Sequence, residues 1–283
     1  MLIRHGFSIE IACEAPTPLI AMLDLHPSRW HDIVRVGHLT AVSRANGAAV
    51  PVSDYQDQFG NLCRRMVAPA GGIRLEVDGT VRDDGLPDAM PPDGDQLPPE
   101  KLPDDVLVYL LGSRYCETDR LNAVAWQRFG HIQGGRARVQ AICDFVHGHM
   151  AFNYALARPT RTAAEAYEER LAVCRDFAHL AITFCRALNI PARYCTGYLG
   201  DIGVPADPAP MDFSAWFEVF LADRWWTFDA RHNVPRIGRI VMARGRDATD
   251  VAIVNSFGLH TLARFEVITE EVPERGPVAM AAA

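Results

Sequence analysis

A single cysteine lies where a helix is expected to begin, at the start of CRDFAHLAITFCRALNIPARYCTGYL. The unpaired N–H groups and the dipole of a first helical turn favour negative charge, so they should lower the pKa of the Cys174 thiol from roughly 8.5. The same N–H groups can hydrogen-bond the oxyanion that forms when a sulfur attacks an amide carbonyl. This position therefore predicts a thiolate nucleophile, and an ordinary buried cysteine is the alternative.

The helix that should carry Cys174 is marked by apolar residues at three- and four-residue steps. These residues are Phe177, Ala178, Ala181, Ile182, Cys185 and Leu188. The helix should end near Asn189, because Pro191 cannot continue it. Cys174 would then lie in the first turn of a buried helix.

Shorter elements are expected on both sides of this helix. Thr162 and Glu165 fit a capping box, which predicts a short helix that runs toward Arg170. After the long helix, ARYCTGYL predicts a strand, and FSAWFEVFL and WWTFDA predict the two strands of a hairpin with a tight turn at residues 222–224. The expected order is helix followed by antiparallel sheet.

The whole chain divides into three predicted parts. Residues 1–80 alternate short apolar stretches with Pro, Gly and Asn, which indicates an N-terminal β-domain of antiparallel strands. Residues 81–105 are rich in Asp and Pro and can bury little, so they should form a connector. From residue 106 the apolar spacing becomes helical, and residues 106–283 should form the second domain with a C-terminal extension.

The composition excludes several classes of partner. With 49% apolar residues, a formal charge of -7 and no basic cluster, the chain should be globular and bind no nucleic acid. No 18-residue apolar window could span a bilayer, so we expect no membrane contact and a cytoplasmic location. The cysteines are scattered, so most should be reduced thiols, and Cys185 and Cys195 should be small buried hydrophobes. Cys143, His147 and His149 lack the companion ligands of a zinc site, so we expect no metal and no cofactor.

Three segments, PARYCTGYL, AWFEV and WWTFDARHN, resemble the core of the bacterial transglutaminase-like family. The resemblance covers about residues 105–265. It implies an α+β fold, in which an N-terminal β-sandwich-like domain precedes a papain-like transglutaminase core of helices packed on an antiparallel sheet.

The resemblance also implies the candidate catalytic residues. In that family a cysteine opens the central helix, a histidine begins the AW-containing strand and an aspartate ends the next strand. The matching positions here are Cys174, Ser214 and Asp229. The run RIGRIVMARGRDATDVAIVNSFG is typical of the same family subgroup, and Asp247 within it should cap a closing helix.

Serine at position 214 departs from the family pattern, which has His-Ala-Trp where this chain has Ser-Ala-Trp. A serine hydroxyl neither accepts nor donates protons readily near neutral pH, so it cannot replace an imidazole. His232 is the nearest candidate substitute. A two-residue hairpin loop at positions 222 and 223 would, by strand alternation, place Asp229 on the Ser214 face and point His232 away. A three-residue loop would reverse this, and we favour the two-residue loop.

Two hypotheses about function remain open. In the first, which the resemblance implies, Cys174 attacks a glutamine or amide carbonyl of a peptide or protein substrate and passes the acyl group from a thioester to an amine or water. In the second, Ser214 silences the site and the cleft persists as a peptide-binding or scaffold module. A serine introduced to disable an enzyme would leave the same sequence and restore the first hypothesis. An edge of the N-terminal sheet could also pair copies of the chain into a homo-oligomer.

Overall fold

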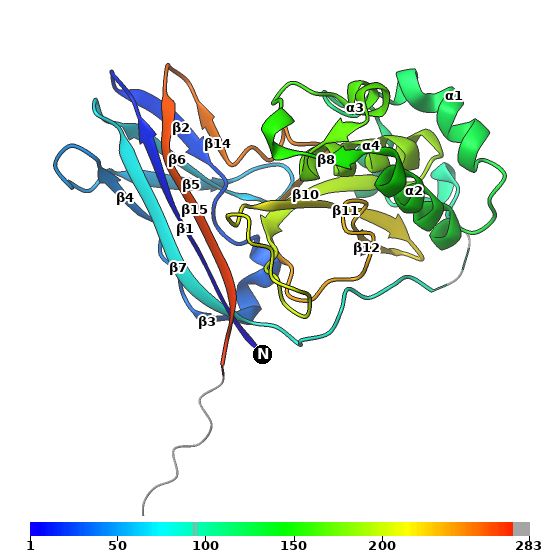
Figure 1. Ribbon diagram of the computed structural model, residues 1–283, viewed down its shortest axis with the longest axis horizontal. Helices are drawn as coiled ribbons and strands as arrows, with labels where there is room; N and C mark the ends of the chain where they lie inside the picture. Colours follow the sequence, from blue (N-terminus) through cyan, green and yellow to red (C-terminus); the bar gives the residue numbers. More distant parts are fainter. Residues whose placement is uncertain (93, 95, 274–283) are drawn as a thin grey trace, which may run out of the picture.

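A β-sandwich lies beside a second lobe in which helices cover an antiparallel sheet (Figure 1). The structure is a computed structural model that describes residues 1–92, 94 and 96–273. The arrangement confirms the expected α+β class and the antiparallel strands expected in the first part of the chain.

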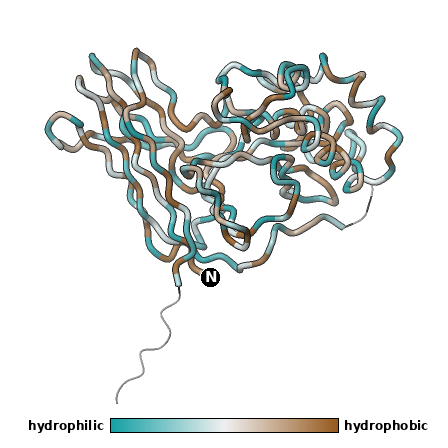
Figure 2. Tube along the Cα trace, viewed as in Figure 1, coloured by the Kyte–Doolittle hydropathy of each residue, from teal (hydrophilic) through white to brown (hydrophobic). Residues whose placement is uncertain are grey.

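Two sheets form the sandwich. The first has the order β15-β1-β7-β3, with β4 also paired to β7, and the second has the order β14-β2-β6-β5. The strands of the first sheet are β1 (Leu2–Ala12), β3 (Ile33–Arg35), β4 (Thr40–Ser43), β7 (Ile73–Arg82) and β15 (Thr261–Val272). Those of the second are β2 (Thr17–Ala21), β5 (Val52–Gln56), β6 (Leu62–Ala68) and β14 (Val254–Ser256), and the 3₁₀ helix η1 (Pro27–Asp32) precedes β3. Buried and more exposed residues alternate along much of β1, β2 and β6, and the buried apolar residues of both sheets form one core. Figure 2 shows hydrophobic and hydrophilic residues interspersed along these strands.

The last described strand joins the first one. β15 pairs antiparallel with β1 from Leu2 opposite Val272 to Ala12 opposite Thr261. The closing helix predicted after Asp247 is wrong for the described residues, because strands β14 and β15 follow instead. The Asp247 carboxylate accepts hydrogen bonds from the backbone N–H groups of Tyr115 and Thr249, both at 2.8 Å. Strand β14 pairs with β2 in the same way. The expected boundaries near residues 80 and 105 remain predictions.

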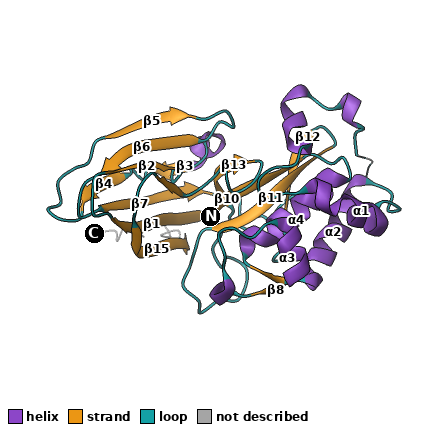
Figure 3. Ribbon diagram, turned by 90° about the horizontal axis from the view of Figure 1, so that it is seen from above, coloured by secondary structure: helices purple, strands orange, loops and turns teal. Residues whose placement is uncertain are grey.

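The second lobe holds the helices and a four-stranded sheet with the order β12-β11-β10-β13 (Figure 3). Its sheet contains β10 (Ala192–Tyr198), β11 (Ser214–Leu221), β12 (Arg224–Phe228) and β13 (Ile240–Gly245). Its helices are α1 (Thr118–Phe129), α2 (Gly135–His149), α3 (Ala163–Glu169) and α4 (Cys174–Ala187). Shorter elements are η2 (Pro99–Lys101), η3 (Asp104–Leu110), η4 (Tyr154–Leu156) and the parallel pair β8 (Ala151–Phe152) and β9 (Leu171–Ala172). None of the described helices is long and apolar enough to cross a membrane.

Helix α4 is the centre of this lobe. Every residue from Cys174 to Ala187 except Arg175 is buried, because the other helices contact α4 from outside while β10 and β11 contact it from the sheet. Its predicted extent is confirmed, and Asn189 just beyond it adopts a left-handed φ of 62°. The predicted capping box of α3 is also confirmed, with Thr162 as its N-cap residue.

The hairpin of β11 and β12 has the two-residue loop that the sequence favoured. Leu221 pairs directly with Arg224, and the loop residues Ala222 and Asp223 have φ values of 48° and 61°. Such a turn matches the twist of the flanking strands, but it places a Cβ-bearing alanine in the left-handed region. The turn fixes the register of β11 and β12, in which Phe228, the last residue of β12, lies opposite Phe217.

A shared apolar core joins the two lobes. Tyr198 and Phe213 of the second lobe pack with Ile3 and Phe7 of β1, and the rings of Phe213 and Phe7 lie 6.1 Å apart. The segment immediately before β11 is thereby held against the sandwich. This packing determines where Ser214, the first residue of β11, is placed.

We expect Ala222→Asn to raise the free energy of unfolding by about 0.5–1 kcal/mol, because asparagine tolerates a left-handed φ better than alanine. Urea unfolding at pH 7, followed by circular dichroism, measures the change. The control is Ala157→Asn, where φ is -59° and no strain is relieved. An equal gain at both positions would contradict the explanation.

Candidate active site

Cys174 is the first residue of α4 and is nearly covered, with 8% of its surface exposed. The two-residue strand β9 leads into it and pairs with β8, so Phe152 lies beside Ala172. The guanidinium of Arg231 lies 4.0 Å from the centre of the Phe152 ring. Tyr154 and Arg231, which come from two distant segments, both interact electrostatically with Cys174.

Burial raises the pKa of the Cys174 thiol to about 11. The positive charge of Arg231 and the backbone N–H groups of Arg175 and Ala215 favour the thiolate, and Asp212 opposes it. The predicted lowering of this pKa is therefore wrong, because the loss of solvent outweighs the donors at the helix N-terminus. At pH 7 only roughly one resting thiol in ten thousand is ionised.

A buried ion-pair cluster fixes the first turn of α4. The Asp176 carboxylate accepts hydrogen bonds from Arg161 Nη1 at 2.9 Å, Arg175 Nη2 at 2.8 Å and the backbone N–H of Val173 at 3.1 Å. The side chains of Asp176 and Arg161 are 0% and 4% exposed. These bonds satisfy the donors at the helix start and orient the turn that carries the sulfur.

Ser214 begins β11, and the N–H of the following residue, Ala215, is one of the two backbone donors that favour the Cys174 thiolate. The hydroxyl of Ser214 is buried and has no hydrogen-bond partner among the described residues. The structure thus links Ser214 to Cys174 through the adjacent backbone, without a bond from the hydroxyl to the thiol.

Asp229 follows directly after β12 and is buried as an ion pair. Its Oδ2 accepts a hydrogen bond from Arg239 Nη2 at 2.8 Å, and Arg239 Nε donates to Asp88 Oδ2 at 2.8 Å. Burial alone would raise the pKa of Asp229, but Arg239 and His232 hold this pKa below its usual range. Asp229 is therefore ionised at neutral pH.

His232 contacts Asp229, so the prediction that it points away from the Asp229 face is wrong. Its Nδ1 lies 2.8 Å from Asp229 Oδ2. Strand alternation does not apply, because β12 ends at Phe228 and residues 229–232 form a turn. The N–H groups of Arg231 and His232 donate to Asp229 Oδ1 at 2.9 and 3.1 Å, which closes the turn and brings the imidazole back to the carboxylate.

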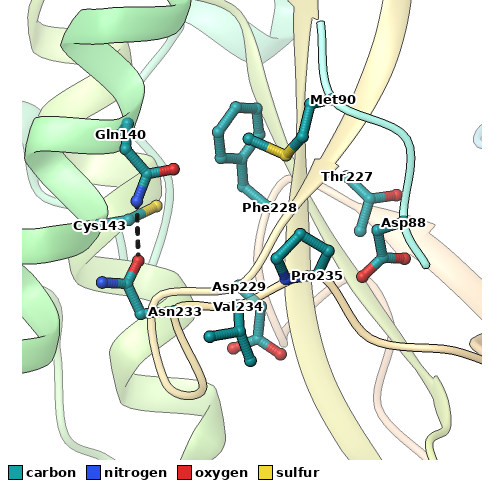
Figure 4. A pocket seen from close by; sticks show the side chains of 10 residues that line it. All are labelled: Asp88, Met90, Gln140, Cys143, Thr227, Phe228, Asp229, Asn233, Val234 and Pro235. Atoms are coloured by element: carbon teal, nitrogen blue, oxygen red, sulfur yellow. Dashed lines mark hydrogen bonds between the residues drawn. The ribbon is translucent and has the colours of Figure 1, made fainter. Parts of the chain in front are cut away.

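Helix α2 supports this turn from one side (Figure 4). Gln140 Nε2 donates to Asn233 Oδ1 at 3.0 Å, and His147 Nδ1 lies 2.8 Å from the carbonyl oxygen of Arg231. The cavity drawn in Figure 4, about 30 Å³ in volume, is lined by Cys143 and Asp229 among others and is too small for a ligand. Within the described part of the chain, no group of three or more His, Cys, Asp or Glu residues could hold a metal ion.

A second cavity, of about 80 Å³, connects the separate parts of the site. Ser214 and His232 both line it, together with Tyr154, Asp212 and Arg231, which also interact electrostatically with Cys174. Tyr154 Oη donates to Asp212 Oδ2 at 3.3 Å, and burial raises the pKa of Asp212. The cavity therefore connects the imidazole with side chains that act on the sulfur.

Sequence analysis missed Tyr154, Asp212 and Arg239 as parts of this site. Asp212 precedes Ser214 by two residues, so the period of a strand could have suggested a shared face. Tyr154 and Arg239 carry no such signal, because only the tertiary fold brings them to the sulfur and to Asp229.

Comparison with known proteins supports the family resemblance and the fold. Residues 127–230 match the model of the transglutaminase-like superfamily, and this range contains Cys174, Ser214 and Asp229. The crystal structure of a protein from Cytophaga hutchinsonii, provisionally described as a cysteine protease, has a TM-score of 0.81 and 27% identity over 98% of this chain and 92% of that one. An uncharacterised protein from Mycobacterium leprae is 33% identical over 91 residues, which are 31% of this chain and 32% of that protein. The chain thus matches about a third of the length of this curated relative, and the predicted family resemblance is confirmed.

Alkylation of folded Cys174 by iodoacetamide should accelerate about tenfold per pH unit between pH 7 and 9, because the thiolate fraction rises tenfold per unit below the pKa. Mass spectrometry of the peptide that contains Cys174, after timed quenching, measures the rate. The same peptide in urea is the control and should level off near pH 8.5–9, close to the pKa of an exposed thiol. A plateau above pH 8 in the folded protein would show that burial does not raise the pKa.

Arg239→Met should lower the free energy of unfolding by about 3–5 kcal/mol at pH 7, because it leaves the Asp229 carboxylate buried without its cation. Since the pKa of Asp229 is lowered in the folded state, its contribution is present above the unfolded pKa and is lost as the pH falls through the folded pKa. The difference between the two proteins should therefore shrink below about pH 4. Urea unfolding from pH 2.5 to 7 tests this, with the exposed Arg264→Met as a control that should change little. A pH-independent difference would refute the assignment.

Proposed function

We propose that the protein is a cysteine-dependent enzyme of acyl transfer or amide hydrolysis, because residues 127–230 match the model of the transglutaminase-like superfamily. The proposal is supported by Cys174 being the first residue of α4, where two backbone N–H groups favour its thiolate. One comes from Arg175 in α4 and the other from Ala215 in β11, and both favour negative charge at Cys174. Donors fixed in this way can also stabilise the oxyanion of a tetrahedral intermediate.

The reaction begins when the Cys174 sulfur attacks the carbonyl carbon of a glutamine or other amide in a peptide or protein. A C–S bond forms, the C–N bond breaks and ammonia or an amine leaves with a proton, which yields a thioester. A primary amine then attacks the thioester to give a new amide, or water attacks it to give a carboxylate. Transglutamination, deamidation and proteolysis differ only in the leaving and attacking groups.

A second function, a silenced peptide-binding module, is favoured by Ser214 and by the raised pKa of the Cys174 thiol. A buried thiol without a base is a poor nucleophile near pH 7. The cleft around it would then bind a peptide without turning it over. The two functions are distinguished by whether acyl groups accumulate on Cys174.

A cytoplasmic location and self-association are parts of the proposal. The edge strand β5 is exposed over its whole length, from Val52 to Gln56, and its free backbone groups could pair with a second copy of the chain.

Ser214→His should raise the rate of thioester formation by about 10²–10⁴-fold, because it places an imidazole beside the Cys174 thiol. The assay incubates each protein with a glutamine-containing peptide, with and without a primary amine, and identifies products by mass spectrometry. Crosslinked product with amine and glutamate-containing product without it would indicate a transglutaminase, whereas chain cleavage would indicate a protease.

Ser214→Ala is the matched control for this substitution and should leave the rate unchanged. Cys174→Ala should abolish product in every background. Turnover that survives Cys174→Ala would refute the proposed nucleophile.

A further inference from the structure

A thiol with a raised pKa needs a proton acceptor during attack, and Ser214 cannot serve as one. Two other groups line the cavity beside the sulfur and can carry a proton, namely the Asp212 carboxylate and the His232 imidazole. Asp212 already accepts a hydrogen bond from Tyr154, and a carboxylate is a much weaker base than a thiolate. His232 is therefore the better candidate on chemical grounds.

The contact between His232 and Asp229 determines the protonation of the imidazole. Because the pKa of Asp229 is held below its usual range, the carboxylate is ionised and can only accept a hydrogen bond. The 2.8 Å contact therefore requires a proton on His232 Nδ1, and in the neutral ring the lone pair is on Nε2. The turn bonds from the Arg231 and His232 N–H groups to Asp229 hold this pair in one geometry.

The cavity offers room for solvent between this imidazole and side chains whose charges act on the thiol. Its volume of about 80 Å³ can hold at least two water molecules. Ser214 is among the residues that line it. A histidine at position 214 would occupy part of the space that the small serine leaves open.

We propose that His232, oriented by Asp229, accepts the proton of Cys174 through solvent in the cavity that it shares with Ser214. The inference rests on the proposed function. The Cys174 proton passes through water to His232 Nε2 as the sulfur bonds to the carbonyl carbon. The resulting imidazolium, stabilised by the Asp229 carboxylate, returns the proton to the leaving nitrogen when the C–N bond breaks.

The test combines His232→Asn with Ser214→His in a four-protein cycle. Asparagine keeps an N–H donor for Asp229 but removes the basic nitrogen. Each protein reacts with p-nitrophenyl acetate, and the burst of p-nitrophenol reports acylation of Cys174, with the Cys174→Ala protein as the blank. Circular dichroism melting shows whether each variant is folded.

His232→Asn should slow acylation about 100-fold in the protein with Ser214 but far less in the Ser214→His protein, where a second imidazole can accept the proton. A purely structural role would slow both backgrounds equally, and that result overturns the inference. Acylation that depends on Cys174 but not on His232 also overturns the role of His232. So does acylation that appears only after Ser214→His. In both cases Cys174 remains the nucleophile. If Cys174 is acylated in none of the four proteins, the proposed function itself fails.

Discussion

Cys174, Asp176 and Phe177 in the first turn of α4 are buried, and the rest of the site is arranged around that constraint. A helix start has unpaired N–H groups, and burial without partners would cost free energy for each of them. Asp176 satisfies the N–H of Val173, and Arg161 and Arg175 neutralise its charge. Removing one member of such a cluster would leave an uncompensated buried charge, which typically costs about 3–5 kcal/mol. This ion-pair cluster therefore helps to fix the position of the sulfur, and its member Arg175 also supplies a backbone N–H that favours the thiolate.

A second chain of charges holds the turn after β12. Asp88, Arg239 before β13 and Asp229 form a continuous series of 2.8 Å bonds. The Asp88 carboxylate limits where the Arg239 guanidinium can lie. The guanidinium in turn keeps Asp229 ionised, and an ionised Asp229 orients His232. Three segments far apart in the sequence thus determine which nitrogen of one imidazole carries a proton.

Local signals in the sequence predicted the elements that carry the site. The apolar spacing and Pro191 defined α4, the Thr162–Glu165 capping box defined α3, and the short loop at residues 222 and 223 set the hairpin register. Each of these signals acts within a few residues, so a single sequence contains it. The transglutaminase-like resemblance added the fold class, which comparison with known proteins confirms.

The failed predictions depend on tertiary structure. The pairing of β15 with β1 links residues about 260 positions apart and leaves no local signature. The pKa of Cys174 rises because surrounding segments exclude water, whereas the sequence reveals only the helix N-terminus that acts in the opposite direction. His232 was misplaced because strand alternation was extended past Phe228, where an Asx-type turn replaces the strand.

Burial raises the pKa of the Cys174 thiol, so ionising it before attack costs free energy at pH 7. A free thiolate is thus a costly intermediate in this site. Transfer of the proton during attack avoids the buried thiolate, and the negative charge then develops on the carbonyl oxygen near the N–H groups of Arg175 and Ala215. The imidazolium formed at the same time lies against an ionised Asp229 and not in an apolar pocket. A buried thiol and an imidazole–carboxylate pair are therefore compatible with one reaction. The buried thiol needs a proton acceptor, and the imidazole supplies it.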